Sequence, residues 1–260
     1  MHAASRSILR GICIGFVAAG LFGGPLGPAG AEETASQKRQ ITEWKKLSER
    51  VRTLYGQEQF EEAEAAAREA LDLVERSLGP THRYVATSLG NLAMVLEARD
   101  KLSEIEPILL RALAIREAAL GPWHLDIAKS LSNLGRLYHV HDDYAKALEY
   151  YQRALEMREA LRGPYDVSVA SSLHDVAAVY RDEGRYAEAE PLLQRELSIW
   201  EYAMGPEHPI LIFVLESYAD TLRHLGQERR AVSLEARVER LRRIRDAKLS
   251  TKTIAPEAPE

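Results

Sequence analysis

The sequence predicts an all-α protein, a right-handed α-solenoid of about five antiparallel helical hairpins. A Gly-Pro pair recurs with its glycine at 79, 121, 163 and 205, a constant step of 42 residues. Between these pairs, apolar residues follow helical spacing, and no run shows the alternation of a strand. With 260 residues, of which 46% are hydrophobic, the chain is long and apolar enough to bury a sizeable core. These observations exclude a chain that is disordered throughout.

The first element, residues 1–31, has the pattern of a secretory signal peptide. Arg6 and Arg10 precede an apolar run over 12–22, and the small residues Ala29, Gly30 and Ala31 suit cleavage after Ala31. The run is short for a hydrocarbon layer of about 30 Å, so a permanent membrane anchor is the weaker alternative. We therefore expect a periplasmic or secreted bacterial protein with no membrane contact after cleavage.

Each period contains two amphipathic helices, called A and B here. Small residues, Gly135 in helix A and Ala147 in helix B, let the two helices approach closely. Glycine and proline then end helix B, because glycine adopts the left-handed conformation past the helix end and proline cannot continue the helix. In the third period the helix A stripe is Ile127, Ala128, Leu131, Leu134, Gly135 and Tyr138, and the helix B stripe is Tyr144, Ala147, Leu148, Tyr151, Ala154 and Leu155.

Counting by the period places five hairpins in a domain over residues 32–245. The last hairpin ends in an arginine-rich polar cap, as terminal repeats require. Residues 246–260 lack an apolar stripe and contain Pro256 and Pro259, so we expect a disordered tail. The predicted hairpins lie near 40–78, 84–120, 126–162, 168–204 and 209–245.

The small residue in helix A, the tyrosine three positions later and the alanine in helix B resemble the tetratricopeptide repeat. That unit usually has 34 residues, and the longer unit here is similar to the repeats of the kinesin light chain family. The segments 130–134, 179–182 and 188–193 match that family closely, and the resemblance covers residues 43–245. It implies that A helices line a concave groove that binds a protein or peptide segment.

One column of the A helices is the first candidate for the groove. Asn91 and Asn133 lie one period apart, and Asp175 and Ser217 continue the column. Asparagine both donates and accepts, so it suits pairing with the backbone of an extended peptide. The resemblance implies the same role, because the equivalent asparagines of the kinesin light chain family contact cargo peptides. The alternative is that these side chains only cap or bridge helices.

Cationic side chains surround this column. Arginine pairs well with carboxylates, so an acidic segment of the partner is one expectation. Acidic residues share the same face, and the alternative is that many of these charges pair with one another. The candidate groove residues are Asn91, Lys129, Asn133, Arg136, His139, Asp175, Arg181 and Arg223.

Other function classes find little support. A net charge of −5 and a pI near 6.0 argue against a nucleic-acid binder. The sequence has no Gly-x-Ser-x-Gly turn, phosphate-binding Gly-rich loop or His-Glu-x-x-His motif, so neither an enzyme nor a cofactor is predicted. His139, His141, Asp142 and Asp143 cluster at one turn, but nothing fixes them in a zinc geometry, and no metal is predicted. The recurrence of His82, His124 and His208 after the Gly-Pro pairs indicates loop or helix-capping residues.

The leading hypothesis is an exported scaffold that binds a protein or peptide segment in the groove. The alternative is a self-assembling structural element whose end repeats stack, with a homo-oligomer as the result. Arginines of residues 237–245 would then attract an acidic run in the first hairpin, namely Glu58, Glu61, Glu62 and Glu64.

Overall fold

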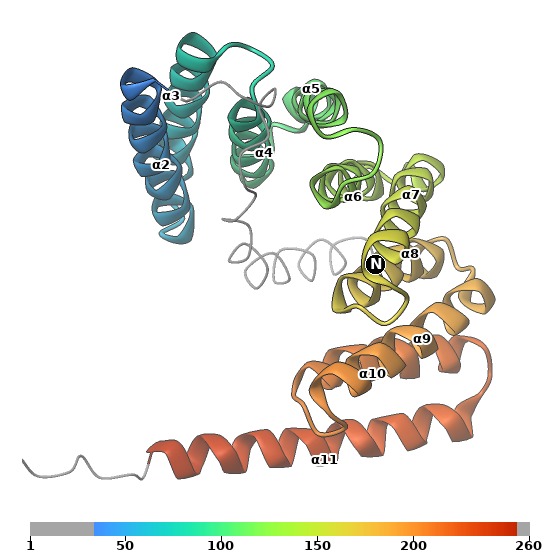
Figure 1. The fold of residues 1–260 in the computed structure, drawn as a ribbon. Helices are drawn as coiled ribbons and strands as arrows, with labels where there is room; N and C mark the ends of the chain where they lie inside the picture. The colour runs from blue at the N-terminus through green and yellow to red at the C-terminus, as the bar shows by residue number, and fades with distance from the viewer. Residues whose placement is uncertain (1–33, 254–260) are drawn as a thin grey trace, which may run out of the picture. The chain divides into compact units, whose positions relative to one another are not determined.

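The computed structural model describes residues 34–253, and the all-α prediction is confirmed there: ten helices and no strand (Figure 1). The helices alternate as A and B members of five hairpins. The predicted leader and the end of the predicted tail lie outside the described residues. The hairpins are α2 (Ala35–Gly56) with α3 (Phe60–Leu78), α4 (Arg83–Ala98) with α5 (Leu102–Leu120), α6 (Leu125–Val140) with α7 (Tyr144–Arg162), α8 (Val167–Asp182) with α9 (Tyr186–Met204), and α10 (Ile210–His224) with α11 (Glu228–Thr253).

The chain divides into two compact units. The first holds helices α2 to α5, and the second holds α6 to α11, beginning at Trp123. Within the second unit, α10 and α11 pack side by side as an antiparallel pair (Figure 1). No described helix combines the length and the apolar character that a membrane span needs.

The B helices end as the Gly-Pro pairs predict. Gly163, for example, follows α7 with a φ of 86°, and its N–H donates to the carbonyl oxygen of Glu159 at 2.9 Å. A side chain at this φ would strain the backbone, so glycine followed by proline gives a sharp stop. Gly79, Gly121 and Gly205 occupy equivalent positions with φ of 91°, 77° and 86°.

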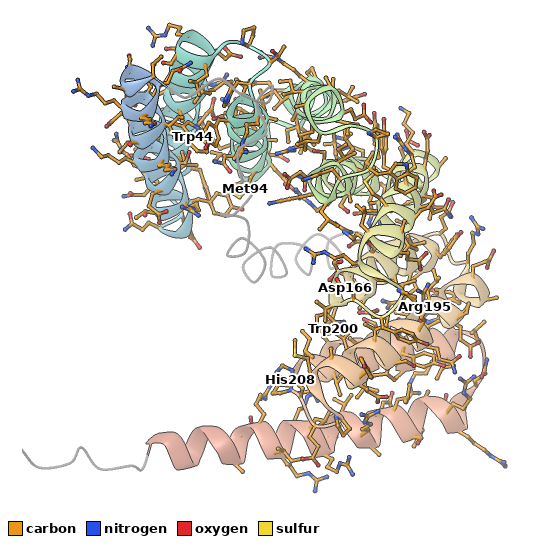
Figure 2. All side chains as sticks on the ribbon, in the orientation of Figure 1. Trp44, Met94, Asp166, Arg195, Trp200 and His208 are labelled. Carbon is orange, nitrogen blue, oxygen red and sulfur yellow. The ribbon has the colours of Figure 1, made fainter. Side chains whose placement is uncertain are left out.

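Four of the A helices begin at a capping residue that also recurs with the period. The Nδ1 atom of His82 accepts a hydrogen bond from the N–H of Tyr84, and His124 and His208 make the same bond two residues ahead. The predicted capping role of these histidines is therefore confirmed. Asp166 completes the column, because its Oδ1 accepts from the N–H of Ser168 at 2.8 Å. Asp166 and His208 precede α8 and α10 in Figure 2.

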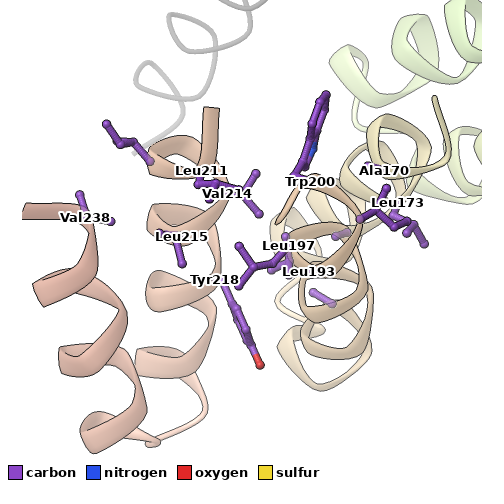
Figure 3. Packing of buried hydrophobic residues seen from close by; sticks show 14 of the residues in the cluster. Ala170, Leu173, Leu193, Leu197, Trp200, Leu211, Val214, Leu215, Tyr218 and Val238 are labelled. Atoms are coloured by element: carbon purple, nitrogen blue, oxygen red, sulfur yellow. The ribbon is translucent and has the colours of Figure 1, made fainter. Parts of the chain in front are cut away.

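The core of the second unit lies between neighbouring hairpins. Side chains of α8 and α9 meet those of α10 and α11 in one buried cluster (Figure 3). Leu193 and Leu215 are fully buried, and Trp200 is 6% exposed. In the first unit, Trp44 stacks on Tyr84 with ring centroids 4.3 Å apart and donates its indole N–H to Ser88 Oγ at 2.7 Å. Each unit thus has its own apolar core.

Helices α6 and α7 approach closely at Gly135. A Cβ atom at this position would lie 2.7 Å from the ring of Tyr151, which is itself buried. Helices α4, α8 and α10 carry alanine at the equivalent position, and their B helices carry a smaller residue opposite, such as Leu109 or Leu193. Glycine therefore makes room for an aromatic ring in this hairpin.

The B helices are joined by arginine. Arg195 of α9 donates to the carbonyl oxygen of Pro164 at 3.1 Å and pairs with Glu159 of α7 at 2.5 Å (Figure 2). Arg111 binds Pro80 and Glu75 in the same way, and Arg237 binds Pro206 and Glu201. We call this repeated contact the arginine clamp.

The last helix is longer than expected. It continues past Arg245 to Thr253, into the segment for which the sequence analysis predicts disorder. The physical reason is that no residue between Asp246 and Thr253 stops a helix, since the first proline is Pro256. The predicted tail beyond Thr253 lies outside the described residues.

Candidate functional site

The predicted groove residues fall on A helices in both units. Asn91 is on α4 of the first unit, and the others are on α6, α8 and α10 of the second unit. We define the A-face of the second unit by one column and its neighbours along those three helices. The column is Asn133, Asp175 and Ser217, and the neighbours are Lys129, Arg136, His139, His174, Arg181, Asp220 and Arg223.

The two asparagines have free amide groups. Asn91 and Asn133 are half-buried, and neither makes a hydrogen bond within residues 34–253. The bonds expected of a cap or of a bridge between helices are therefore missing from the described part of the chain. The chain contains only two asparagines, and both stand in this column. An amide left half-exposed with unused donors and acceptors suits a ligand backbone.

The cations of the A-face, in contrast, are paired within the protein. His139 Nε2 lies 2.8 Å from Asp182 Oδ2, and Arg181 Nη2 lies 2.7 Å from Asp220 Oδ2. Arg223 binds Glu235 of α11 through two nitrogens. Lys129 and Arg136 also have interaction partners. These pairs link α6 to α8, α8 to α10 and α10 to α11.

Sequence analysis missed a buried polar cluster in the fourth hairpin. Glu196 of α9 is 2% exposed, and its Oε2 lies 3.2 Å from His174 Nδ1 of α8. Burial opposes protonation of His174, but the Glu196 carboxylate outweighs it and raises the pKa of His174. The signal was present in the sequence, because Glu196 replaces the alanine that the preceding three B helices carry, for example Ala154.

Asp175 belongs to the same cluster. Burial raises the pKa of Asp175, and Glu196 adds to this effect, while His174 and Arg158 oppose it. The guanidinium of Arg158 donates to Ser172 Oγ. Asp175 makes no hydrogen bond or ion pair with any residue of the described segment.

The first unit has a separate ion cluster. Glu64 of α3 is 6% exposed and pairs with Arg68, Arg99 and Lys101, while Glu61 pairs with Arg99. Burial alone would raise the pKa of Glu64, but the three cations lower it to about 2. Two of the four acidic residues invoked for stacking are thus bound inside the first unit.

The turn with two histidines is occupied by local contacts. His139 is buried against Asp182, and Asp143 caps α7 by accepting from the N–H of Lys146. Among residues 34–253 no group of three or more acidic, histidine or cysteine side chains is placed to hold a metal ion.

A shallow pocket lies beside the B helix of the fourth hairpin. It has a volume of about 370 Å³ and is lined by residues of the α7–α8 loop and of α9. Two exposed tyrosines, Tyr165 and Tyr202, have ring centroids 6.1 Å apart beside this region. No candidate groove residue lines it.

Comparison with protein families decides the assignment. The profile of the tetratricopeptide repeat matches residues 46–118, 84–160 and 168–244. The chain belongs to the tetratricopeptide repeat family. A comparison with curated proteins gives no match.

Solved structures share the fold of this tetratricopeptide repeat protein. One is a Podosopora anserina structure of nearly identical TPR-like repeats of the kinesin light chain type, with 22% identity, a TM-score of 0.70, and coverage of 79% of this chain and 97% of that chain. BtubC (BKLC) from P. vanneervenii has 19% identity, a TM-score of 0.67, and coverage of 88% and 96%. Bacillus thuringiensis PlcR, solved with the peptide PapR7 and DNA, has 13% identity, a TM-score of 0.58, and coverage of 86% and 76%.

Proposed function

We propose that this protein is an exported protein–protein interaction scaffold that binds an extended peptide segment along its A helices. The observation that carries the proposal is the pair of half-buried asparagines with unused amide groups, one period apart in sequence. Such amides pair with a peptide backbone without reading its side chains. Family membership supports a binding role, and PlcR is a fold neighbour that was solved with a peptide.

Peptide display against the purified protein tests this proposal. The affinity of the selected peptide is measured by fluorescence anisotropy for the wild type, Asn133→Ala and Gln194→Ala. Gln194 is a matched control, because it is an exposed amide on α9 that lines the shallow pocket. We expect Asn133→Ala to weaken binding about fivefold to tenfold, the effect of one or two lost hydrogen bonds, and Gln194→Ala to leave it unchanged.

The opposite pattern would overturn the assignment. If Gln194→Ala weakens binding and Asn133→Ala does not, the peptide binds near the shallow pocket. Circular dichroism of each variant verifies that the helices remain folded.

Export rests on the leader sequence alone. Its arginines, apolar run and small-residue triplet support cleavage after Ala31 and a periplasmic or secreted location. Fractionation of the source bacterium and the intact mass of the recovered protein test this. We expect a chain beginning at Glu32 outside the cytoplasm, and a full-length chain in the cytosolic fraction would contradict export.

A further inference from the structure

The fourth hairpin departs from the repeat at three neighbouring positions. Its A helix carries His174 and Asp175 where α6 carries Ser132 and Asn133, and its B helix carries Glu196 where α7 carries Ala154. One imidazole and two carboxyl groups thus replace a hydroxyl, an amide and a methyl group. The periodic packing of the hairpins does not require this change.

The first carboxyl group, Glu196, is bound inside the protein. It is buried, and its Oε2 lies 3.2 Å from His174 Nδ1, whose ring lies against Phe213 of α10 at a centroid distance of 4.8 Å. This pair holds the Glu196 carboxylate beneath the A-face and offsets its charge with the imidazole of His174.

The second carboxyl group, that of Asp175, has acceptor oxygens that no described residue uses. It is half-buried and makes no hydrogen bond or ion pair with the described residues. Arg158, the nearby cation of α7, donates its guanidinium hydrogen bond to Ser172 instead. The raised pKa of Asp175 agrees with this geometry, because burial, with a smaller contribution from Glu196, outweighs the opposing effects of His174 and Arg158. A half-buried acid of this kind gains from a donor that a ligand supplies.

The rest of the A-face offers little to an anion. His139, Arg181 and Arg223 are each paired with a carboxylate of the protein. Asn133 and Asp175 of this face, in contrast, make no side-chain hydrogen bond or ion pair with the described residues. Charge complementarity at this face therefore favours a cationic occupant over an acidic one.

We propose that the peptide segment bound by the second unit places a lysine or arginine side chain against Asp175. This inference rests on the proposed function and names the chemistry of its partner: an extended peptide with a basic side chain at one fixed position. Asn133, one period before Asp175, pairs with the peptide backbone, and Asp175 reads the side chain. The expectation of an acidic segment is replaced for this unit by a basic one.

A peptide library with one variable central position tests the inference. The peptides are acetylated and amidated, and the flanking residues come from the sequence selected by display. The variant Asp175→Asn removes the charge but keeps the shape, and it restores the amide found at Asn91 and Asn133. The control Glu149→Gln makes the same change of charge at an exposed position on α7.

We expect the wild type and Glu149→Gln to bind peptides with lysine or arginine about tenfold more tightly than the same peptides with glutamate. Asp175→Asn should abolish that difference. In the wild type, carboxyl carbon NMR should show that the pKa of Asp175 falls when the lysine peptide binds, a measurement that needs no variant.

The outcomes separate the two proposals. If the wild type binds none of the displayed peptides, the proposed function itself fails. If peptides bind but glutamate is preferred, or basic residues bring no advantage, this inference fails and the scaffold function stands. Retention of the basic preference by Asp175→Asn would also overturn it.

Discussion

At the scale of single residues, the contact between Gly135 and Tyr151 shows how one hairpin departs from its neighbours without losing its packing. The period indicates a small residue in helix A, and the sequence analysis predicts the close approach of the helices. The choice of glycine over alanine depends on the ring of Tyr151, which occupies the space of the missing Cβ. The reason for a glycine thus lies in a residue of the partner helix.

This contact predicts that the effect of substituting Gly135 on stability depends on the residue at position 151. Gly135→Ala should lower the free energy of unfolding by about 1–2 kcal/mol, because the clash with a buried ring exceeds the gain in helix propensity. In the Tyr151→Leu background, Gly135→Ala creates the alanine–leucine pair of the second and fourth hairpins, so the same change should be neutral or stabilising. Urea denaturation of the four proteins measures the coupling, and equal effects in both backgrounds would contradict it.

Glu64 shows a second residue-scale effect, because its charge is held by three cations. The folded pKa is about 2, below the ordinary value of 4.5. A lowered pKa contributes stability that is present above the unfolded value and is lost as the pH falls from about 4.5 towards 2. We expect Glu64→Gln to destabilise the first unit by about 2 kcal/mol at pH 7, after allowance for solvent screening, and by much less near pH 3.

Urea denaturation at pH 7, 4 and 3 measures this difference. Glu62→Gln, at an exposed position on the same helix, provides the control. A difference between wild type and Glu64→Gln that is as large at pH 3 as at pH 7 would show that the ion cluster does not stabilise the unit.

At the scale of helices, the sequence predicts the helix ends as well as the apolar stripes. Helix ends follow from the Gly-Pro pairs, and helix starts follow from the column of His82, His124, Asp166 and His208. Helix α11 ends at Thr253, beyond the predicted boundary at Arg245, because no helix breaker precedes Pro256 even though the apolar stripe is weak. Propensity and the absence of a stop signal explain the extra turns.

The arginine clamp is an element-scale contact that the sequence analysis did not identify. Its signal is a pair of columns, arginine at 111, 195 and 237 and glutamate at 75, 159 and 201. Either column alone indicates only a charged face. The two columns together predict a contact between B helices. The proline carbonyl of the Gly-Pro pair, which lies past the helix end, supplies the acceptor for the arginine.

The arginine clamp predicts that Arg195→Ala weakens the contact between α9 and α7. We expect the free energy of unfolding of this variant to fall by about 1 kcal/mol, because one hydrogen bond and one partly exposed ion pair are lost. Arg195→Lys should be less stable than the wild type, since a single ammonium group does not reproduce both contacts. Thermal and urea unfolding measure the change, with Arg162→Ala at an exposed site as control. An Arg195→Ala variant as stable as the wild type would contradict the clamp.

At the scale of the whole molecule, bulk charge is a poor guide to the partner. The net charge of −5 argues against a polyanionic partner, whereas the cations of the A helices suggest an acidic ligand. The structure pairs His139, Arg181 and Arg223 with carboxylates of neighbouring helices, which the period does not reveal because each partner comes from a different column. The position of the asparagines was predictable from the repeat. Their free amides, and the role of Glu196 beneath Asp175, required the three-dimensional contacts.

The central claim is that the A helices, and not the B helices, bind the partner. Photo-crosslinking with the displayed peptide tests it most directly, with p-benzoylphenylalanine replacing Ala178 on α8 in one variant and Ala187 on α9 in another. Ala178 lies one turn after Asp175 and is half-buried, whereas Ala187 is exposed. The account predicts a crosslinked adduct at position 178 and none at 187. An adduct at position 187 alone would contradict it.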